Sequence, residues 1–305
     1  MNIQFNTKDM PEQGLRIILP TDPSFDTGLA SSNLPNTSSD LLKSLSVFVQ
    51  NTGSRSVVAY MLRWELTYAD GKTVHIDRDF SSPAFLMEEW GTNKLTDHQG
   101  NNINPDSMKF FSLVPPEKTD QGTLGSYSGS STNPSNPLQN ADQKQVREKN
   151  MKSLMEELIH VTSITISIDG VFFDDGIFSG FDRTNFFAKF KARCDAKRDL
   201  YNEVLLKIQS KEPVNKVIEY VDALSRGQQP ESKSTVSIAS AYDFKNLSDN
   251  NGLNSSTYPI VREYSEHKKT YAREFIRQSQ RIGIQKAIET IQSRIAKPWA
   301  PLRKL

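Results

Sequence analysis

The segment from Lys43 to Phe80 constrains the fold more than any other part of the chain. Apolar residues recur at every second position on both sides of a turn cluster at Asn51–Arg55, and Asp70-Gly71 stands where a two-residue hairpin loop belongs. The longer alternating run consists of Val58, Tyr60, Leu62, Trp64, Leu66 and Tyr68. Because a period of two separates the apolar and polar faces of a strand, the segment predicts a half-buried antiparallel sheet.

Further strands are expected on either side of this segment. Leu15–Leu19 and Met108–Val114 are predicted to be short strands that end at prolines, whereas residues 21–41 have the composition of a long loop. Residues 161–181 return to alternation and contain Asp174-Asp175-Gly176, a sequence suited to a hairpin turn with positive φ. We expect these strands to join residues 43–80 in one sandwich.

A polar insertion interrupts the predicted sandwich. Residues 117–141 carry too little apolar surface to offset the entropy cost of ordering them, which predicts a mobile loop. A helix is expected at about 142–160, where Asp142 could cap its first turn.

From Asp182 onward the apolar period changes to 3.6 residues, which indicates helices. Asp182 is a suitable N-cap for the first helix, Pro213 opens a shorter one, and Pro259 begins the last long helix. Gly283 lies where the apolar stripe of the last helix shifts, so we expect a kink or a change of partner there.

Composition limits the class of protein. Charged residues make up 24% of the chain, and the formal net charge of +1 gives no overall field that would attract nucleic acid or a membrane. Cys194 is the single cysteine, so a disulfide within the chain is impossible, and we expect a half-buried thiol on a helix. The first residues show no signal-peptide pattern and no stretch is apolar enough to cross a membrane, so the default expectation is the cytosol.

An acidic cluster is the first candidate for chemistry. Asp169, Asp174, Asp175 and Asp182 fall within fourteen residues, but they do not follow the spacing of a calcium-binding loop. We interpret them as turn and helix-capping residues. The alternative is an enzyme of unrecognised type with an acidic site near Asp174.

The remaining motifs predict no catalytic, cofactor-binding or metal-binding residues. The four histidines, His75, His98, His160 and His267, have no zinc-ligand spacing. The glycines at 122, 125 and 129 lack the strand and helix context of a phosphate loop. Tyr60 and Trp64 could line a carbohydrate-binding surface, although their shared alternation with Leu62 favours the sandwich core.

The last 48 residues carry a marked positive surplus. Eleven lysines and arginines stand against four glutamates, a local charge of +7 in a chain whose total is +1. The surplus could mark a face for an acidic partner, RNA or anionic lipid, or it could be the solvated side of a core helix. The candidate face consists of Lys268, Lys269, Arg273, Arg277 and Arg281. Aromatic residues of this helix share the apolar stripe, so there is no strong nucleic-acid signal.

The stretch VFVQNTGSRSVVAYMLRWEL resembles the small immunoglobulin-like modules of bacterial envelope and secreted proteins, which pair a strand, an Asn-containing turn and a second strand with a central aromatic residue. The later SIDGVFFDDGIFSGFD, followed by a helix, is similar to a pattern in uncharacterised bacterial proteins. The resemblance covers about 43–80 and 161–182. It implies a β-sandwich and an exported protein, and it implies no catalytic residues.

The sequence therefore predicts an α+β protein, in which an antiparallel immunoglobulin-like β-sandwich at 1–181 is followed by an α-helical C-terminal domain at 182–305. The predicted function is non-enzymatic: a protein-interaction or scaffold protein that binds a protein partner through the basic C-terminal helix. The enzyme and the carbohydrate-binding module stay as alternatives. The oligomeric state is left open.

Overall fold

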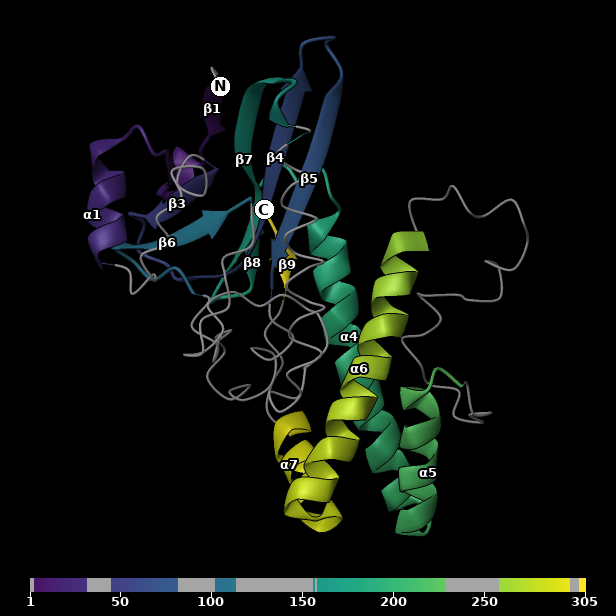
Figure 1. The fold of residues 1–305 in the computed structure, drawn as a ribbon. Coiled ribbons are helices and arrows are strands. Elements are labelled where there is room, and N and C mark those ends of the chain that lie inside the picture. Colours follow the sequence, from purple (N-terminus) through teal and green to yellow (C-terminus); the bar gives the residue numbers. More distant parts are fainter. Residues whose placement is uncertain are drawn as a thin grey trace, which may run out of the picture. The chain divides into compact units, whose positions relative to one another are not determined.

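The computed structural model describes residues 3–31, 45–81, 102–113, 156, 158–228, 258–296 and 302–305. It shows a mixed α+β protein, with nine strands and five α-helices in the described part (Figure 1). The chain divides into a strand unit, which covers most of residues 1–174, and a helical unit, which holds residues 182–305 and a short segment at 175–178. Each unit is described separately below.

The strand unit contains a sheet built around two long antiparallel strands. β4 and β7 pair along most of their length, β5 pairs with the other edge of β4, and β1 runs parallel to β7 with Gln4 opposite Ser163. Gly71 adopts a φ of +81° in the turn between β4 and β5, as expected for the Asp70-Gly71 hairpin. The strands are β1 (Gln4–Lys8), β4 (Val57–Tyr68), β5 (Thr73–Phe80) and β7 (Val161–Phe173).

The second sheet has three antiparallel strands in the order β2 (Leu15–Ile18), β3 (Ser46–Asn51) and β6 (Ser107–Ser112), and a 3₁₀ turn, η1 (Pro11–Gln13), precedes β2. A helix, α1 (Pro23–Ser31), lies against it and buries Phe25 on Phe48. The prediction of a loop over residues 21–41 is therefore wrong for Pro23–Ser31. The sequence does contain a signal for the start of this helix, the pair Asp22-Pro23. In the structure, Asp22 accepts a hydrogen bond from the Ser24 N–H and Pro23 stands in the first helical turn.

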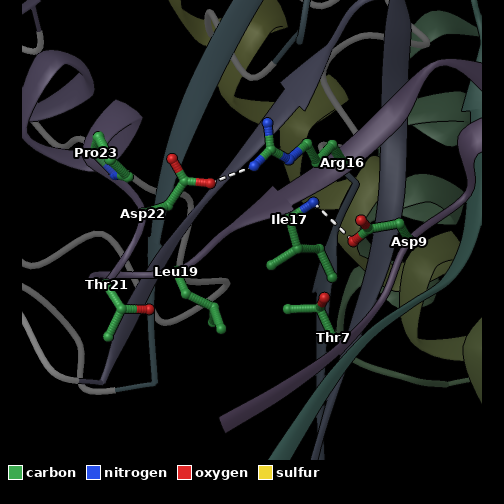
Figure 2. Close-up of a pocket in the computed structure, with 8 residues that line it drawn as sticks. All are labelled: Thr7, Asp9, Arg16, Ile17, Leu19, Thr21, Asp22 and Pro23. Carbon is green, nitrogen blue, oxygen red and sulfur yellow. Dashed lines mark hydrogen bonds and ion pairs between the residues drawn. The ribbon is translucent and has the colours of Figure 1, made fainter.

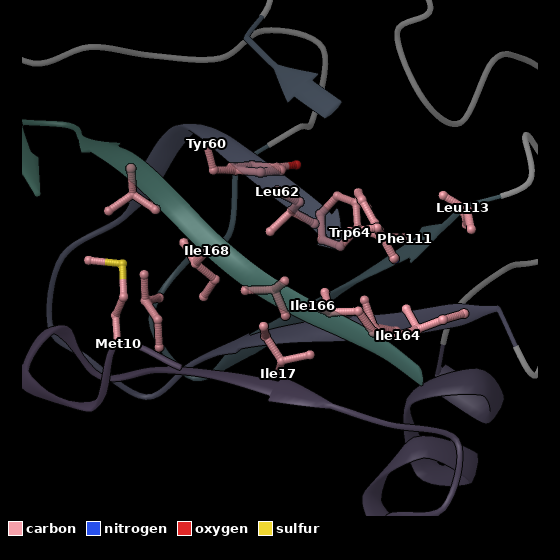
Figure 3. Close-up of a cluster of buried hydrophobic side chains, with 14 of the residues drawn as sticks. Met10, Ile17, Tyr60, Leu62, Trp64, Phe111, Leu113, Ile164, Ile166 and Ile168 are labelled. Atoms are coloured by element: carbon pink, nitrogen blue, oxygen red, sulfur yellow. The ribbon is translucent and has the colours of Figure 1, made fainter. Parts of the chain in front are cut away.

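The two sheets share one hydrophobic core (Figure 3). It combines Ile17 of β2 and Phe111 of β6 with alternate residues of the larger sheet, among them Trp64 and Ile166. Trp64 and Tyr60 are each only 1% exposed, which confirms the core interpretation of their alternation and excludes them from a sugar-binding surface.

The helical unit is organised around two long helices that run side by side (Figure 1). Tyr271 and Phe275 of α6 pack with Leu200 and Val204 of α4, and both α5 and α7 contact α6. Gly283, with a φ of +88°, separates α6 from α7, so the predicted break in the last helix is present. The elements are α4 (Phe186–Gln209), α5 (Val214–Ser225), α6 (Tyr258–Ile282), α7 (Ile284–Ile295), β8 (Ile177–Ser179) and β9 (Arg303–Lys304).

Asp182 does not occupy the N-cap position that the sequence predicts. α4 begins at Phe186, after Asn185 in a left-handed conformation, and the Asp182 carboxylate accepts a bond from the Phe187 N–H at 3.0 Å. The side chain still satisfies the first turn, but across five residues instead of three.

Some predictions fall outside the described residues. These are the polar insertion at 117–141, most of the helix at 142–160 and His98. Among the helices that are described, none combines the length and apolar character needed to cross a membrane.

Candidate functional site

The predicted basic face divides into one largely enclosed cation, Lys268, and four others, of which three are exposed. Lys268 is largely enclosed: its side chain is 17% exposed, and its ammonium donates to Glu203 of α4 at 2.7 Å. Lys268 therefore belongs to the contact between α4 and α6.

The four other cations form what we call the basic stripe: Lys269, Arg273, Arg277 and Arg281. They recur at every fourth residue of α6, so each lies about one helical turn beyond the last and the stripe winds slowly along the helix. The three arginines are exposed. Lys269 pairs with Glu266 on its own helix at 2.9 Å, and Arg273 Nε donates to the Ser225 carbonyl at the end of α5 at 3.1 Å. Arg277 and Arg281 make no hydrogen bond or ion pair with another described residue.

Nearer the start of α6, this helix and α4 are joined by a set of charged and phenolic contacts that we call the polar seam. Arg193 pairs with Glu263 at 2.8 Å. Tyr264 donates to Asp199 at 2.7 Å, and Tyr220 of α5 donates to Glu203, which also holds Lys268. Burial is the main cause that raises the pKa of Asp199, whereas for Glu263 burial is outweighed by Arg193 and the pKa is lowered. The seam fixes the register of the two helices.

A fully buried lysine lies further along the same interface. Lys197 of α4 has no exposed surface, and its ammonium lies 5.1 Å from the Tyr271 ring centroid and 5.7 Å from that of Tyr201. Glu274 of α6 lies in the same region, where burial raises its pKa and the charge of Lys197 opposes that rise. Arg294 of α7 donates to the Tyr201 hydroxyl at 3.2 Å.

The polar seam was not predicted, although α4 carried a signal for it. Residues 192–197 read Ala-Arg-Cys-Asp-Ala-Lys, and all six are buried. Small and apolar residues at Ala192, Cys194 and Ala196 alternate with these charges, so the short run has no purely polar face. The identity of the partners depends on a pairing with residues about seventy positions away, which a single sequence does not reveal.

Cys194 is more buried than expected. Its side chain is 7% exposed, and burial raises the pKa of the thiol to about 12. A thiol in that state is almost entirely protonated at neutral pH, so it has little of the thiolate that nucleophilic chemistry requires.

Two of the acidic residues near 174 use their carboxylates to hold backbone N–H groups in place. Asp175 accepts the Ile177 N–H in the turn before β8, and Asp182 accepts the Phe187 N–H and pairs with Lys304. Asp169 is buried in the strand unit, and Asp174 donates its own N–H to the Ser56 carbonyl. In the described part of the chain, no three His, Cys, Asp or Glu side chains gather as metal ligands would.

A shallow hollow of about 380 Å³ opens on the strand unit (Figure 2). Arg16 and Asp22 pair with each other across it, and Asp9 accepts the Ile17 N–H at 2.9 Å, so its charged groups already have partners. Its lining is polar, whereas small-molecule sites are mostly apolar. The residues around it are Thr7, Asp9, Arg16, Ile17, Leu19, Thr21, Asp22 and Pro23.

Known proteins add no family or function to this geometry. Comparisons of the chain with protein-family models, with curated proteins and with solved structures found no significant match.

Proposed function

We propose that this chain is a non-enzymatic interaction protein that binds an acidic segment of a protein partner along the basic stripe of α6. The observation that carries the proposal is the regular spacing of Lys269, Arg273, Arg277 and Arg281, of which the three arginines are exposed. Arginine presents a planar array of donors that suits carboxylates.

The spacing sets the chemistry of the partner. Steps of four residues along a helix place successive cations about 6 Å apart and extend the stripe over about 18 Å. A helical segment with a glutamate or aspartate at every fourth position presents carboxylates with the same repeat. Two such helices can therefore lie alongside each other and form several ion pairs at once.

The packing of α6 supports a preformed binding face. Its opposite side contributes Val261, Tyr264, Tyr271 and Phe275 to the core of the helical unit, and the polar seam prevents it from sliding against α4. The stripe is thus held in place before a partner arrives, which lowers the entropy cost of binding. These aromatic residues are buried, so they offer no surface on which nucleic-acid bases would stack.

The strand unit serves as the scaffold in this proposal, and we propose that it is an immunoglobulin-like sandwich. Two sheets that share one core, with antiparallel pairing between β4 and β7 and between β3 and β6, support that assignment. The parallel pairing of β1 with β7 adds a strand to the edge of the larger sheet.

Charge reversal tests the function without removing core residues. Deletion of residues 258–305 would remove buried side chains of α6 and unfold the helical unit, so we choose R273E/R277E/R281E. The control, K8E/K72E/K286E, reverses three exposed charges elsewhere and has the same net charge. The probe is a labelled helical peptide with glutamate at every fourth position.

We expect the stripe variant to lose binding by about a hundredfold, because each exposed ion pair contributes up to about 1 kcal/mol and charge reversal replaces that attraction by repulsion, while the control variant stays within about threefold. Wild-type binding should weaken as salt is raised, because exposed charges are screened. An equal loss of peptide binding in both variants would show that binding depends on net charge alone, and would refute the basic stripe as the binding face. Tighter binding to an RNA oligomer or to anionic vesicles than to the peptide would replace the proposed partner.

A further inference from the structure

The segment at 302–305 docks beside β8 as a short parallel strand within the helical unit. The Arg303 N–H donates to the Gly176 carbonyl and the Leu305 N–H donates to the Phe178 carbonyl, each at 3.1 Å. Ile177 lies opposite Arg303 and Phe178 opposite Lys304. The edge of β8 therefore supplies two alternate carbonyls to an extended segment, as strands do when they accept a peptide.

Between those two bonds, Lys304 reaches a carboxylate that is already fixed. Its ammonium donates to Asp182 Oδ2 at 2.7 Å, and the Asp182 side chain is only 7% exposed. The other oxygen of Asp182 accepts the Phe187 N–H in the first turn of α4. The carboxylate is thus oriented by α4 and does not depend on Lys304 for its position.

An aromatic floor completes this site. The Lys304 ammonium lies 5.7 Å from the Phe178 ring centroid, and Phe178 packs edge-on against Phe186 and Phe187. Phe178 has no exposed surface. A buried carboxylate beside aromatic rings selects for a cation on a long flexible stem, which is the chemistry of lysine.

We propose that the β8 edge and Asp182 form a recognition site for an extended, lysine-bearing segment of a partner protein, and that residues 303–305 fill it as an internal competitor. The contacts come from two backbone carbonyls and one carboxylate, so they require the lysine and the extended backbone but no covalent link to this chain. Two backbone bonds and an ion pair whose lysine is 47% exposed are few contacts, so the internal segment exchanges readily. This inference is independent of the basic stripe.

The test uses the full chain and a labelled peptide, acetyl-Pro-Leu-Arg-Lys-Leu-amide, which copies residues 301–305. Fluorescence anisotropy gives its affinity for the wild type, for three single variants and for the double variant D182N/K304A. K304A weakens the internal competitor, D182N removes the charge of the site but keeps an oxygen that can accept the Phe187 N–H, and R303A is the matched control, because the exposed Arg303 side chain makes no ion pair with a described residue.

We expect K304A to bind the peptide about tenfold more tightly than the wild type, since a site that is mostly occupied binds an added ligand in proportion to its vacant fraction. D182N/K304A should lose that gain, R303A should match the wild type, and a peptide with alanine in place of its lysine should not bind. Peptide affinity that is the same in K304A and the wild type would overturn the internal competitor. Affinity that survives D182N would overturn the recognition site. If the wild type sediments as a dimer and D182N as a monomer, a second copy of this chain replaces the partner protein.

Discussion

Several aspartates of this chain accept hydrogen bonds from backbone N–H groups. Whether the sequence can predict such a bond depends on how many residues separate the aspartate from the N–H. Asp70 and Asp175 each accept the N–H two residues ahead, a local pattern that a turn sequence indicates. Asp9 accepts the Ile17 N–H eight residues ahead, and Asp182 reaches across five residues to α4. The local roles follow from sequence, whereas the longer ones require the path of the chain between donor and acceptor.

Two glycines with the same backbone conformation predict different outcomes on substitution. Gly14 and Gly71 have φ values of +71° and +81°, but a Cβ on Gly14 would lie 2.5 Å from the Gly53 nitrogen, while one on Gly71 would meet nothing within 4 Å. We expect Gly71→Ala to cost about 1–2 kcal/mol for the left-handed backbone, and Gly14→Ala to cost about 1–3 kcal/mol more. Urea denaturation followed by circular dichroism measures both. Equal losses would contradict the close approach of Gly14 to Gly53.

Glu274 predicts a pH dependence of stability with a defined sign. Burial holds the pKa of Glu274 in the folded protein above its unfolded value, so the folded state binds the proton more tightly. Ionisation then costs folding stability at neutral pH, and that cost disappears as pH falls below the raised pKa. We expect the wild type to gain stability relative to E274Q as pH is lowered from 7 towards about 4.5, the unperturbed value.

Glu263 supplies a control of opposite sign for this measurement. Although burial acts to raise it, the hydrogen bond and charge of Arg193 lower the pKa of Glu263 overall. The wild type should therefore lose stability relative to E263Q as pH falls below the unfolded pKa and through the lowered pKa of the folded state. Unfolding free energies of the wild type, E274Q and E263Q, each measured at pH 7 and at lowered pH, decide the matter. Slopes of the same sign for the two glutamates would refute these assignments.

At the scale of elements, strands and long helices could be predicted from periodicity, but their contacts could not. The alternation in residues 43–80 locates β3, β4 and β5, and the 3.6-residue pattern locates α4, α5 and the break at Gly283. α1 escaped prediction because a nine-residue helix in a polar stretch leaves only a capping signal. The polar seam depends on which face of α4 meets α6, and side-chain periodicity alone does not specify that pairing.

The polar seam predicts unequal costs for two similar substitutions. Tyr264→Phe removes the hydroxyl that donates to the buried Asp199, and we expect a loss of about 1–3 kcal/mol because the carboxylate then lacks that donor. Tyr220→Phe removes a hydroxyl from Glu203, which keeps Lys268, so its cost should be below about 1 kcal/mol. Thermal unfolding of both variants, followed at 222 nm, tests the difference. A larger loss for Tyr220→Phe would refute the role given to Lys268.

At the scale of the whole chain, the cations that give the last 48 residues their positive charge have different structural roles. Lys268 pairs with the half-buried Glu203, Arg294 donates to a tyrosine hydroxyl and Lys304 pairs with Asp182, whereas the arginines of the basic stripe are exposed. Sequence composition reveals the surplus, but only the folded arrangement separates the cations with partners inside the helical unit from those exposed to solvent. That distinction restricts the candidate face to four residues.

Because Cys194 is buried, the chain's single thiol can serve as a probe of local opening. Because the sulfur lies inside the helical unit and its pKa is raised to about 12, alkylating reagents reach it only when α4 separates from its neighbours. The rate of labelling then counts the opening events of one helix pair in an otherwise unmodified protein. A partner that stabilises the packed helices would lower the rate of Cys194 labelling, and one that separates them would raise it.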